Sequence, residues 1–361
     1  MTQLLEIPRG EEWKWSDLSV LPELAEAGPS GELPENLPWL DCEGPRLLFV
    51  DGALDRERSD PGPVEVGAVA AKAADHPLAR LVGDSGWRLK LAKHHAPPGI
   101  VQIVHAGSGG ASHLGAEIVL EEDAQASIVE THVGDGWANR LARVALGHGA
   151  RLMLNRRLLG SSGFVSLTDR AELGEGATLT LVNLAAGDAD SRIEGRYALN
   201  GDAAYCEVGG ALLAGDRRRH EANIVLRHEA PSGMSRQSWR SVAGGRGAAS
   251  VAARVEVARG AQKTDAEQSL KGLLLDKGAT ANLKPELEIF ADDVKCAHGA
   301  SVGELDRRAL FYLQTRGIPP AEAQALLTRA FVADALERIG EDGVQAAFAQ
   351  DAEKWLGGGD G

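Results

Sequence analysis

The chain has 361 residues, a net charge of −14 and an ordinary apolar share of 43%. So acidic a surface repels phosphate backbones, which argues against a protein that binds nucleic acid. No run approaches the roughly 18 apolar residues of a membrane span, and residues 1–8 lack the basic and apolar regions of a secretory signal. The three cysteines are widely spaced and form no CxxC pair. These features predict a cytoplasmic protein with reduced thiols.

Residues 1–92 are expected to form an irregular N-terminal region of short helices and a hairpin. Three prolines lie between Glu23 and Leu40 and disfavour long regular elements there. Residues 46–54 form an apolar run that is interrupted at Asp51-Gly52. An Asp-Gly pair between apolar residues is a strong hairpin signal, so we predict a hairpin at this point.

Residues 93–300 contain short stretches of alternating apolar and polar residues, each opened by a Gly-Ala or Asp-Ala pair. The alanines of these pairs lie at positions 124, 150, 177, 203, 248 and 279, so the first three gaps are 26, 27 and 26 residues. The last two gaps, from 203 to 248 and from 248 to 279, are longer and suggest an excursion near residues 209–247. A fixed period of this size is typical of a solenoid, and no long helical pattern separates the strands. We therefore predict a mainly β protein with a parallel β-helix core; an antiparallel sandwich is the alternative.

Residues 301–361 are predicted to form a C-terminal helical hairpin, which could cap the solenoid and serve as a docking surface. Ser301 and Glu304 have the spacing of a capping box, which predicts that the first helix begins at Ser301. Gly317 is the expected C′ glycine of that helix, and Pro319-Pro320 the expected start of the second. Apolar residues that share one face of the second helix are Ala323, Leu326, Leu327, Ala330 and Phe331.

The usual catalytic and nucleotide-binding motifs are missing from the sequence. It has no GxxxxGK[ST], HExxH or GxSxG motif, so we expect no nucleotide to be bound by this chain. Residues 107–110 resemble a phosphate-binding loop only superficially, and we interpret them as a solenoid turn.

The histidines in the first half of the chain are expected to be surface or structural residues. His94 and His95 are adjacent, so on a strand their side chains would diverge, and we expect both at the surface. Three further histidines are spaced in a way that does not match the repeat period, and we interpret them as structural or solvated: His105, His113 and His132.

Cys296 and His298 stand where the β pattern gives way to helices. Residues two apart on an extended segment point to the same side, and thiolate and imidazole are both good ligands for iron or zinc. Two ligands do not complete a tetrahedral site, so the others must come from a distant part of the chain or from another subunit. The alternative is a packed thiol next to a hydrogen-bonded histidine.

Three segments resemble the SufB/SufD family of iron–sulfur cluster assembly scaffolds. Residues 292–318, with the run Asp-Asp-Val-Lys-Cys-Ala-His-Gly, are similar to the C-terminal signature of its D-type branch. Residues 12–18 and 48–52 are similar to an early tryptophan segment and a short hairpin of the family. The B-type branch has an essential cysteine where this chain, aligned without gaps, has Leu270, which favours the D-type branch.

The resemblance implies a right-handed parallel β-helix and a scaffold that is not an enzyme. It implies pairing with a B-type scaffold subunit (SufB) and with an ABC-type ATPase (SufC), which would dock near Phe311–Phe331. His298 matches a histidine at the interface of the two scaffold subunits, where a nascent cluster is held transiently. Cys296 matches the thiol two residues before it. The complex would build iron–sulfur clusters and release them to other proteins.

Two other classes of function remain as alternatives. A β-helix enzyme acting on polysaccharides would need converging carboxylates, for which Asp292 and Asp293 are the candidates. Adjacent residues on a strand face opposite sides, which disfavours that hypothesis. The other alternative is a structural, homodimeric β-helix without metal.

Overall fold

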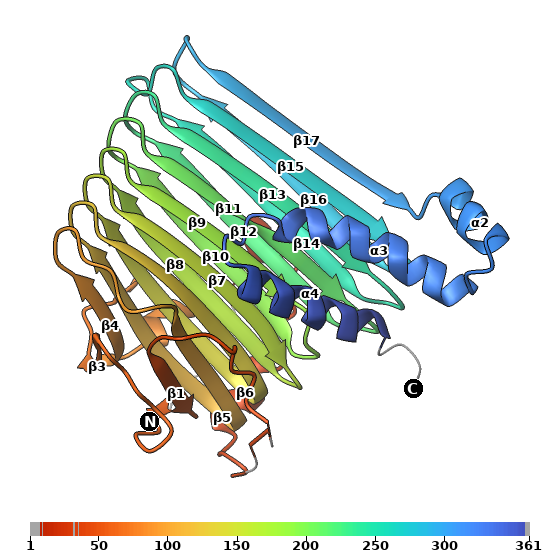
Figure 1. Ribbon diagram of the computed structural model, residues 1–361, viewed down its shortest axis with the longest axis horizontal. Helices are drawn as coiled ribbons and strands as arrows, with labels where there is room; N and C mark the ends of the chain where they lie inside the picture. The colour runs from red at the N-terminus through yellow and green to blue at the C-terminus, as the bar shows by residue number, and fades with distance from the viewer. Residues whose placement is uncertain (1–7, 9, 32, 35, 358–361) are drawn as a thin grey trace.

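A computed structural model describes residue 8 and residues 10–31, 33–34 and 36–357. These residues form a β-solenoid made mainly of parallel strands, with helices at its C-terminal end (Figure 1). The predicted mainly β fold with a parallel β-helix is confirmed, and the antiparallel sandwich is wrong.

The strands of the described chain vary in length from two residues in β2 to 22 in β6, and the longest two, β5 and β6, bend from one sheet into the other. They are β1 (Arg46–Val50), β2 (Ala53–Leu54), β3 (Val64–Ala68), β4 (Ser85–Leu91), β5 (Val101–Leu120), β6 (Gln125–Leu146), β7 (Arg151–Gly160), β8 (Phe164–Leu173), β9 (Thr178–Ala185), β10 (Asp190–Leu199), β11 (Tyr205–Ala214), β12 (Arg219–His228), β13 (Met234–Ala243), β14 (Ala248–Val257), β15 (Asp265–Leu274), β16 (Thr280–Ile289) and β17 (Lys295–Glu304).

Helical segments lie at the two ends of the described chain. They are the 3-10 helices η1 (Glu11–Trp13) and η2 (Ala79–Leu81) and the α-helices α1 (Leu21–Glu26), α2 (Arg307–Thr315), α3 (Pro320–Leu336) and α4 (Asp342–Gly357). None of the described helices is both long and apolar enough to cross a membrane.

The solenoid has two parallel sheets. The front sheet, which faces the viewer in Figure 1, contains β1, the first halves of β5 and β6, and then β7, β9, β11, β13, β15 and β17. The back sheet contains β4, the second halves of β5 and β6, and then β8, β10, β12, β14 and β16. β6 belongs to both because residues 125–134 pair with β7 and residues 137–146 pair with β8.

Each coil contributes one strand to each sheet. Arg151, Thr178 and Tyr205 are successive register partners in the front sheet, and their even spacing matches the predicted period. The next partners in the same row are Met234 and Asp265, so the later coils are longer, but they keep the same pairing. The predicted excursion near residues 209–247 is therefore wrong.

That error has a simple origin in the turns. Ala177 precedes a strand of the front sheet, whereas Ala248 and Ala279 lie where strands of the back sheet begin, so the alanine series mixes two edges of the solenoid. The front-sheet turn before Met234 is Ser232-Gly233, which contains no alanine.

Alternate residues point between the sheets and form a continuous apolar core. Leu181, Ile193, Val208 and Val251 are among its fully buried members. A single coil cannot bury its inward apolar residues alone, because part of their surface is covered only by the neighbouring coils. The coils are therefore stable only as a stack.

The predicted N-terminal hairpin is confirmed. Phe49 pairs with Leu54 and Val50 with Ala53, and Asp51 and Gly52 at the turn both have positive φ, as a tight two-residue turn requires. Residues before and after the hairpin cover the outer faces of the first coils. An example is Trp13, which packs in one cluster with Trp137 and Phe164 of the back sheet.

The start of the first C-terminal helix was predicted wrongly. Ser301 and Glu304 lie in β17, which pairs with β15 as far as Glu304, so strand pairing prevails over the local capping signal. α2 is capped instead by Asp306, whose Oδ1 accepts from the amide of Arg308 at 2.8 Å. Gly317 follows α2 with a φ of 85°, as expected for a C′ glycine.

α3 begins at Pro320, as predicted, but the helical region also contains α4, which the sequence analysis missed. α3 and α4 lie across the front sheet in Figure 1 and pack on its outer face through Val332, Leu336 and Phe348. α2 projects from the end of the solenoid, and no residue of α2 is buried.

The histidine prediction needs one correction. His105 and His132 are register partners on β5 and β6, so they do follow the coil period. Their rings stack at a centroid distance of 4.7 Å and are almost completely buried. Both are structural residues of the interior, whereas His94 and His95 are exposed, as predicted.

Candidate metal site

The predicted ligands Cys296 and His298 lie on β17, the last strand of the front sheet. Among the described residues, β17 pairs only with β15, and β16 pairs only with β14. Each of these two terminal strands therefore has one edge of backbone N–H and C=O groups without a strand partner. β16 and β17 form the terminal coil, and the candidate site lies at this open end of the solenoid.

The register shows which way the two side chains point. Cys296 is the partner of Ala266 and His298 the partner of Gln268, and both of these β15 residues are buried in the interior. Because register partners share a face of the sheet, Cys296 and His298 lie on the inward face of the last strand, with no further coil to cover them. The structure thus places the two residues on one side of β17.

Cys296 is half-buried and packs against the interior core. Burial raises the pKa of its thiol above the ordinary value, and nearby Asp265 raises it further, while a hydrogen bond from the Ala266 backbone opposes both. The thiol is therefore protonated at neutral pH in this chain alone. A metal ion or a cationic partner would be needed to hold it as the thiolate that binds iron.

His298 is exposed, and beneath it lies a polar residue that the sequence analysis missed. Gln268 is 1% exposed, and neither its Oε1 nor its Nε2 has a hydrogen-bond partner among the described residues. A buried amide without partners is costly, so it marks a place where another polar group can bind. The signal for Gln268 lay in the coil spacing, since it stands one coil before His298 in the same register row.

The other residues singled out at this end lie in different settings. Leu270, at the position of the B-type cysteine, is fully buried on β15 beneath Ala300. Asp292 and Asp293 lie in the exposed turn between β16 and β17, where the Asp293 amide donates to Gln262 Oε1 at 3.0 Å.

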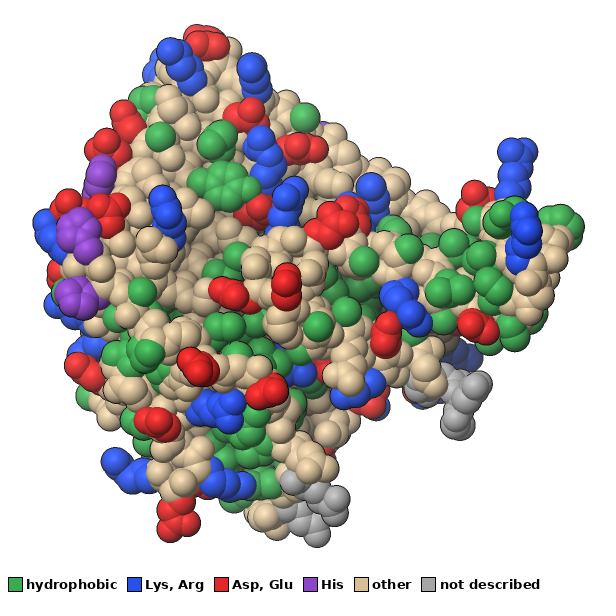
Figure 2. Space-filling view, in the orientation of Figure 1, with side chains coloured by type: hydrophobic (Ala, Val, Ile, Leu, Met, Phe, Trp, Pro, Cys, Tyr) green, Lys and Arg blue, Asp and Glu red, His purple; other side chains and the backbone are tan. Residues whose placement is uncertain are grey.

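Large apolar side chains surround the terminal coil and extend onto α2. The apolar rim, as we call this set, comprises side chains that are between 38% and 68% exposed: Ile289, Phe290, Val302, Phe311 and Tyr312. Figure 2 shows hydrophobic side chains gathered on the projecting helix. Exposed apolar groups beside open strand edges are typical of a surface that binds another protein.

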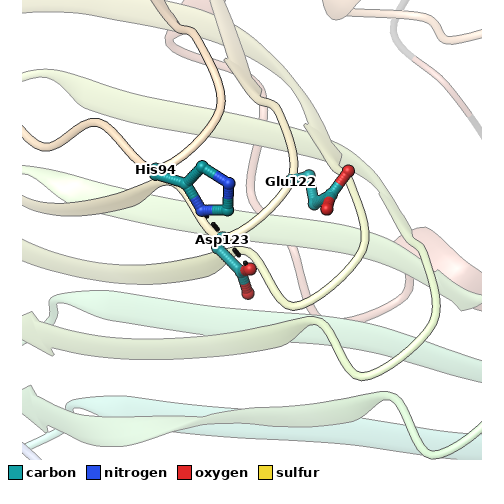
Figure 3. A group of neighbouring side chains, drawn as sticks. All are labelled: His94, Glu122 and Asp123. Atoms are coloured by element: carbon teal, nitrogen blue, oxygen red, sulfur yellow. Dashed lines mark ion pairs between the residues drawn. The ribbon is translucent and has the colours of Figure 1, made fainter.

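A second group of possible metal ligands lies at the turns on one edge of the solenoid (Figure 3). The ligand atoms of His94, Glu122 and Asp123 lie within 4.8 Å of one another. Glu122 also accepts from Lys93 Nζ at 2.5 Å, and His94 Nδ1 lies 3.5 Å from Asp123 Oδ2. Because these exposed charges already compensate one another, we interpret the group as ion pairs between stacked turns.

Together, the solenoid and its open end define a class of protein: a parallel β-solenoid whose last coil is left uncovered. Residues 103–331 match the family model described as SUF system FeS cluster assembly, SufBD core domain. The chain belongs to this family.

Bacterial relatives agree with this assignment, and the chain is also similar to a plant protein. The chain is 27% identical to the iron-sulfur cluster assembly protein SufD of Escherichia coli (strain K12), with 96% of this chain and 89% of that protein covered. It is 26% identical to the protein of the same name from Bacillus subtilis (strain 168), with 70% and 59% covered. It is also 43% identical to the chloroplastic protein ABCI7 of Arabidopsis thaliana over 33% of this chain and 25% of that protein. The resemblance to the D-type branch is thereby confirmed.

Proposed function

We propose that this chain is the D-type scaffold subunit of a SUF-type complex that builds iron–sulfur clusters and releases them. Membership of the FeS assembly family supports this role. The observation that carries it furthest is the open terminal coil, where Cys296 and His298 lie on the inward face of the last strand and no further coil covers them. The cluster is the cargo of this scaffold, and the protein itself acts as no enzyme.

In this proposal a B-type scaffold subunit pairs with the terminal coil. Two free strand edges and the apolar rim offer both hydrogen-bonding groups and apolar area to such a partner. The partner would supply the ligands that Cys296 and His298 lack, since two ligands cannot hold a cluster alone. Pairing would also exclude water from the site. The Cys296 thiol is already half-buried there, so the partner would complete its burial.

An ABC-type ATPase would dock on α2 and the adjoining part of α3. Phe311 and Tyr312 of α2 are 68% and 57% exposed, and α2 projects from the solenoid. Nucleotide binding by the ATPase would shift the pairing of the two scaffold subunits and so expose or cover the ligands. We also infer a cytoplasmic location, which the three free cysteines support.

The role of His298 can be tested in the reconstituted complex with its B-type subunit and ATPase. We expect His298→Ala to lower the yield of assembled cluster at least tenfold, because one ligand is lost while the complex still forms. His148→Ala is the matched control, since His148 is an exposed histidine of a distant turn. Normal cluster yield and normal transfer with His298→Ala would remove His298 from the mechanism.

A further inference from the structure

The outer face of the back sheet carries a ladder of arginines. Arg143, Arg170 and Arg196 are consecutive register partners on β6, β8 and β10, and each points away from the interior. Register partners on neighbouring parallel strands are separated by about 4.8 Å, so three positive charges are stacked at this spacing. Like charges directly opposite one another on a sheet destabilise it.

Two arginines of this ladder donate to backbone carbonyl oxygens of described residues. Arg170 donates to the carbonyl oxygen of Asp169 at 3.2 Å, and Arg143 donates to the carbonyl oxygen of Lys72. None of the three guanidinium groups forms an ion pair with a carboxylate of a described residue. The next arginine along the same row is different, because Arg254 pairs with a glutamate at 3.4 Å.

Two of the acidic residues around the ladder pair with other arginines. Glu117, the register partner of Arg143, accepts from Arg88 Nε at 2.6 Å. Glu194 accepts from Arg192 Nη2 at 2.8 Å. The groove around the ladder is lined by five arginines and three glutamates, so its lining keeps a positive charge of two, in a protein whose net charge is −14.

The ladder lies in a groove of about 640 Å³. Beside the arginines its lining includes the outward-facing apolar residues Val119, Ala145 and Ala198. The exposed carboxylate of Glu172 stands in the same register row as these three residues. A concave site of this size, with apolar residues in its lining and a few converging charged groups, is typical of a small-molecule site. Burial lowers the pKa of Arg170 and the nearby charge of Arg196 lowers it further, while the carboxylates of Asp75, Glu194 and Asp169 oppose both. A bound anion would offset the repulsion between the arginines.

We propose that this groove binds a small anion that carries two or three linked phosphate groups. The planar guanidinium fork matches phosphate oxygens, and linked phosphoryl groups can bridge neighbouring arginines on the ladder. An extended acidic peptide fits less well, because its alternate carboxylates are about 6.6 Å apart and do not match the spacing of the strands. The site is separate from Cys296 and His298, which lie on the other sheet.

The test uses the full chain and inorganic pyrophosphate as the probe, with binding measured by calorimetry in phosphate-free buffer. We expect saturable binding that weakens as salt is added, and at least a tenfold loss of affinity in the double variant Arg170→Gln/Arg196→Gln. The double variant Arg217→Gln/Arg246→Gln is the control, since both are exposed arginines outside the groove and their replacement also removes two positive charges. Circular dichroism should show the same fold for all variants, and Arg143→Gln alone provides a milder variant if the double variant unfolds.

Three results would overturn the proposal. The first is no saturable binding of pyrophosphate by the wild-type chain. The second is an equal loss of affinity in Arg217→Gln/Arg246→Gln, which would indicate a general effect of charge. The third is binding of poly-glutamate, but not pyrophosphate, through the same arginines, which would assign the groove to an acidic protein segment.

Discussion

At the scale of single residues, Arg156 is the centre of a buried ionic network between the two sheets. Its guanidinium group bonds Glu130 at 2.7 Å and Asp169 at 2.7 and 2.9 Å, and the Tyr197 hydroxyl donates to Asp169 at 2.7 Å. Burial would raise the pKa of Glu130, but Arg156 and His105 outweigh it and hold that pKa well below its usual range. The network therefore stays ionised, and each charge depends on its partners.

Removing Arg156 should strongly destabilise the solenoid. Arg156→Met leaves two buried carboxylates without their cation, which costs about 3–5 kcal/mol of unfolding free energy. Arg151→Met on the same strand is the control, because Arg151 is exposed and its loss should cost under about 0.5 kcal/mol. Urea unfolding followed by circular dichroism measures both, and equal values for the two variants would contradict this account.

Buried histidines should make the protein sensitive to mild acid. Burial lowers the pKa of four histidines from 6.5 to about 4: His105, His113, His220 and His228. Between pH 6.5 and 4 the unfolded chain binds protons that the folded chain does not, so stability is complete above pH 6.5 and falls toward pH 4. Each such histidine contributes a slope of up to about 1.4 kcal/mol per pH unit.

This expectation is checked by measuring the free energy of unfolding across that pH range. Burial also lowers the pKa of His132, which has no hydrogen-bond partner among the described residues. Replacing His132 with Leu, the residue that follows it in register at position 158, should reduce the slope by about one proton. A wild-type curve that stays flat from pH 6.5 to 4 would show that these histidines are charged in the folded state.

At the scale of elements, α2 has little support of its own. None of its residues is buried, and its N-terminus depends on the cap at Asp306. Helices as short as this are marginal in water unless they pack against something. Because α2 has so few packing contacts, we predict that it becomes firmly ordered when the ATPase binds.

Hydrogen exchange can test this behaviour of α2. Amides of α2 should exchange rapidly in the isolated chain and become protected in the complex with the ATPase, whereas β11 amides stay protected in both. Asp306→Ala removes the cap, at a cost of about 1 kcal/mol, and should weaken ATPase binding without changing the solenoid. Unchanged exchange of α2 on binding would place the docking surface elsewhere.

The elements of this fold could be predicted from the sequence better than their register. The alternation of apolar residues and the nearly constant spacing of the first turns indicated the solenoid, because each coil repeats the same turn chemistry. The register depends on coil lengths, which increase after Tyr205. His105 and His132, like Arg143 and Arg170, are 27 residues apart and lie in the regular coils, so the spacing of the first turns already contained these pairings, although they were not predicted.

The candidate site was predictable in part. The two-residue spacing of Cys296 and His298 indicated that they share a side, and the strand β17 shows them doing so. The buried amide of Gln268 and the apolar rim were not predictable, since both depend on which coil is the last. Ser301 shows the same limit, because a local capping signal cannot reveal that the strand continues to pair.

At the scale of the whole molecule, the two ends of the solenoid differ. The first coils are covered by the N-terminal region, where residues such as Trp13 and Leu78 pack on the back sheet. The last coil has two free strand edges and the apolar rim. A solenoid end of this kind is completed by a cap or by a second solenoid.

The central claim is that a B-type subunit completes the terminal coil, and native mass spectrometry of the two purified scaffold subunits tests it most directly. We predict a one-to-one complex with the wild-type chain and its loss in the double variant Phe290→Asp/Val302→Asp, which places charge in the apolar rim. Leu81→Asp is the control, since Leu81 is also an exposed apolar residue but lies near the opposite end. A complex that survives the double variant, or a wild-type chain that forms only homodimers, would contradict the account.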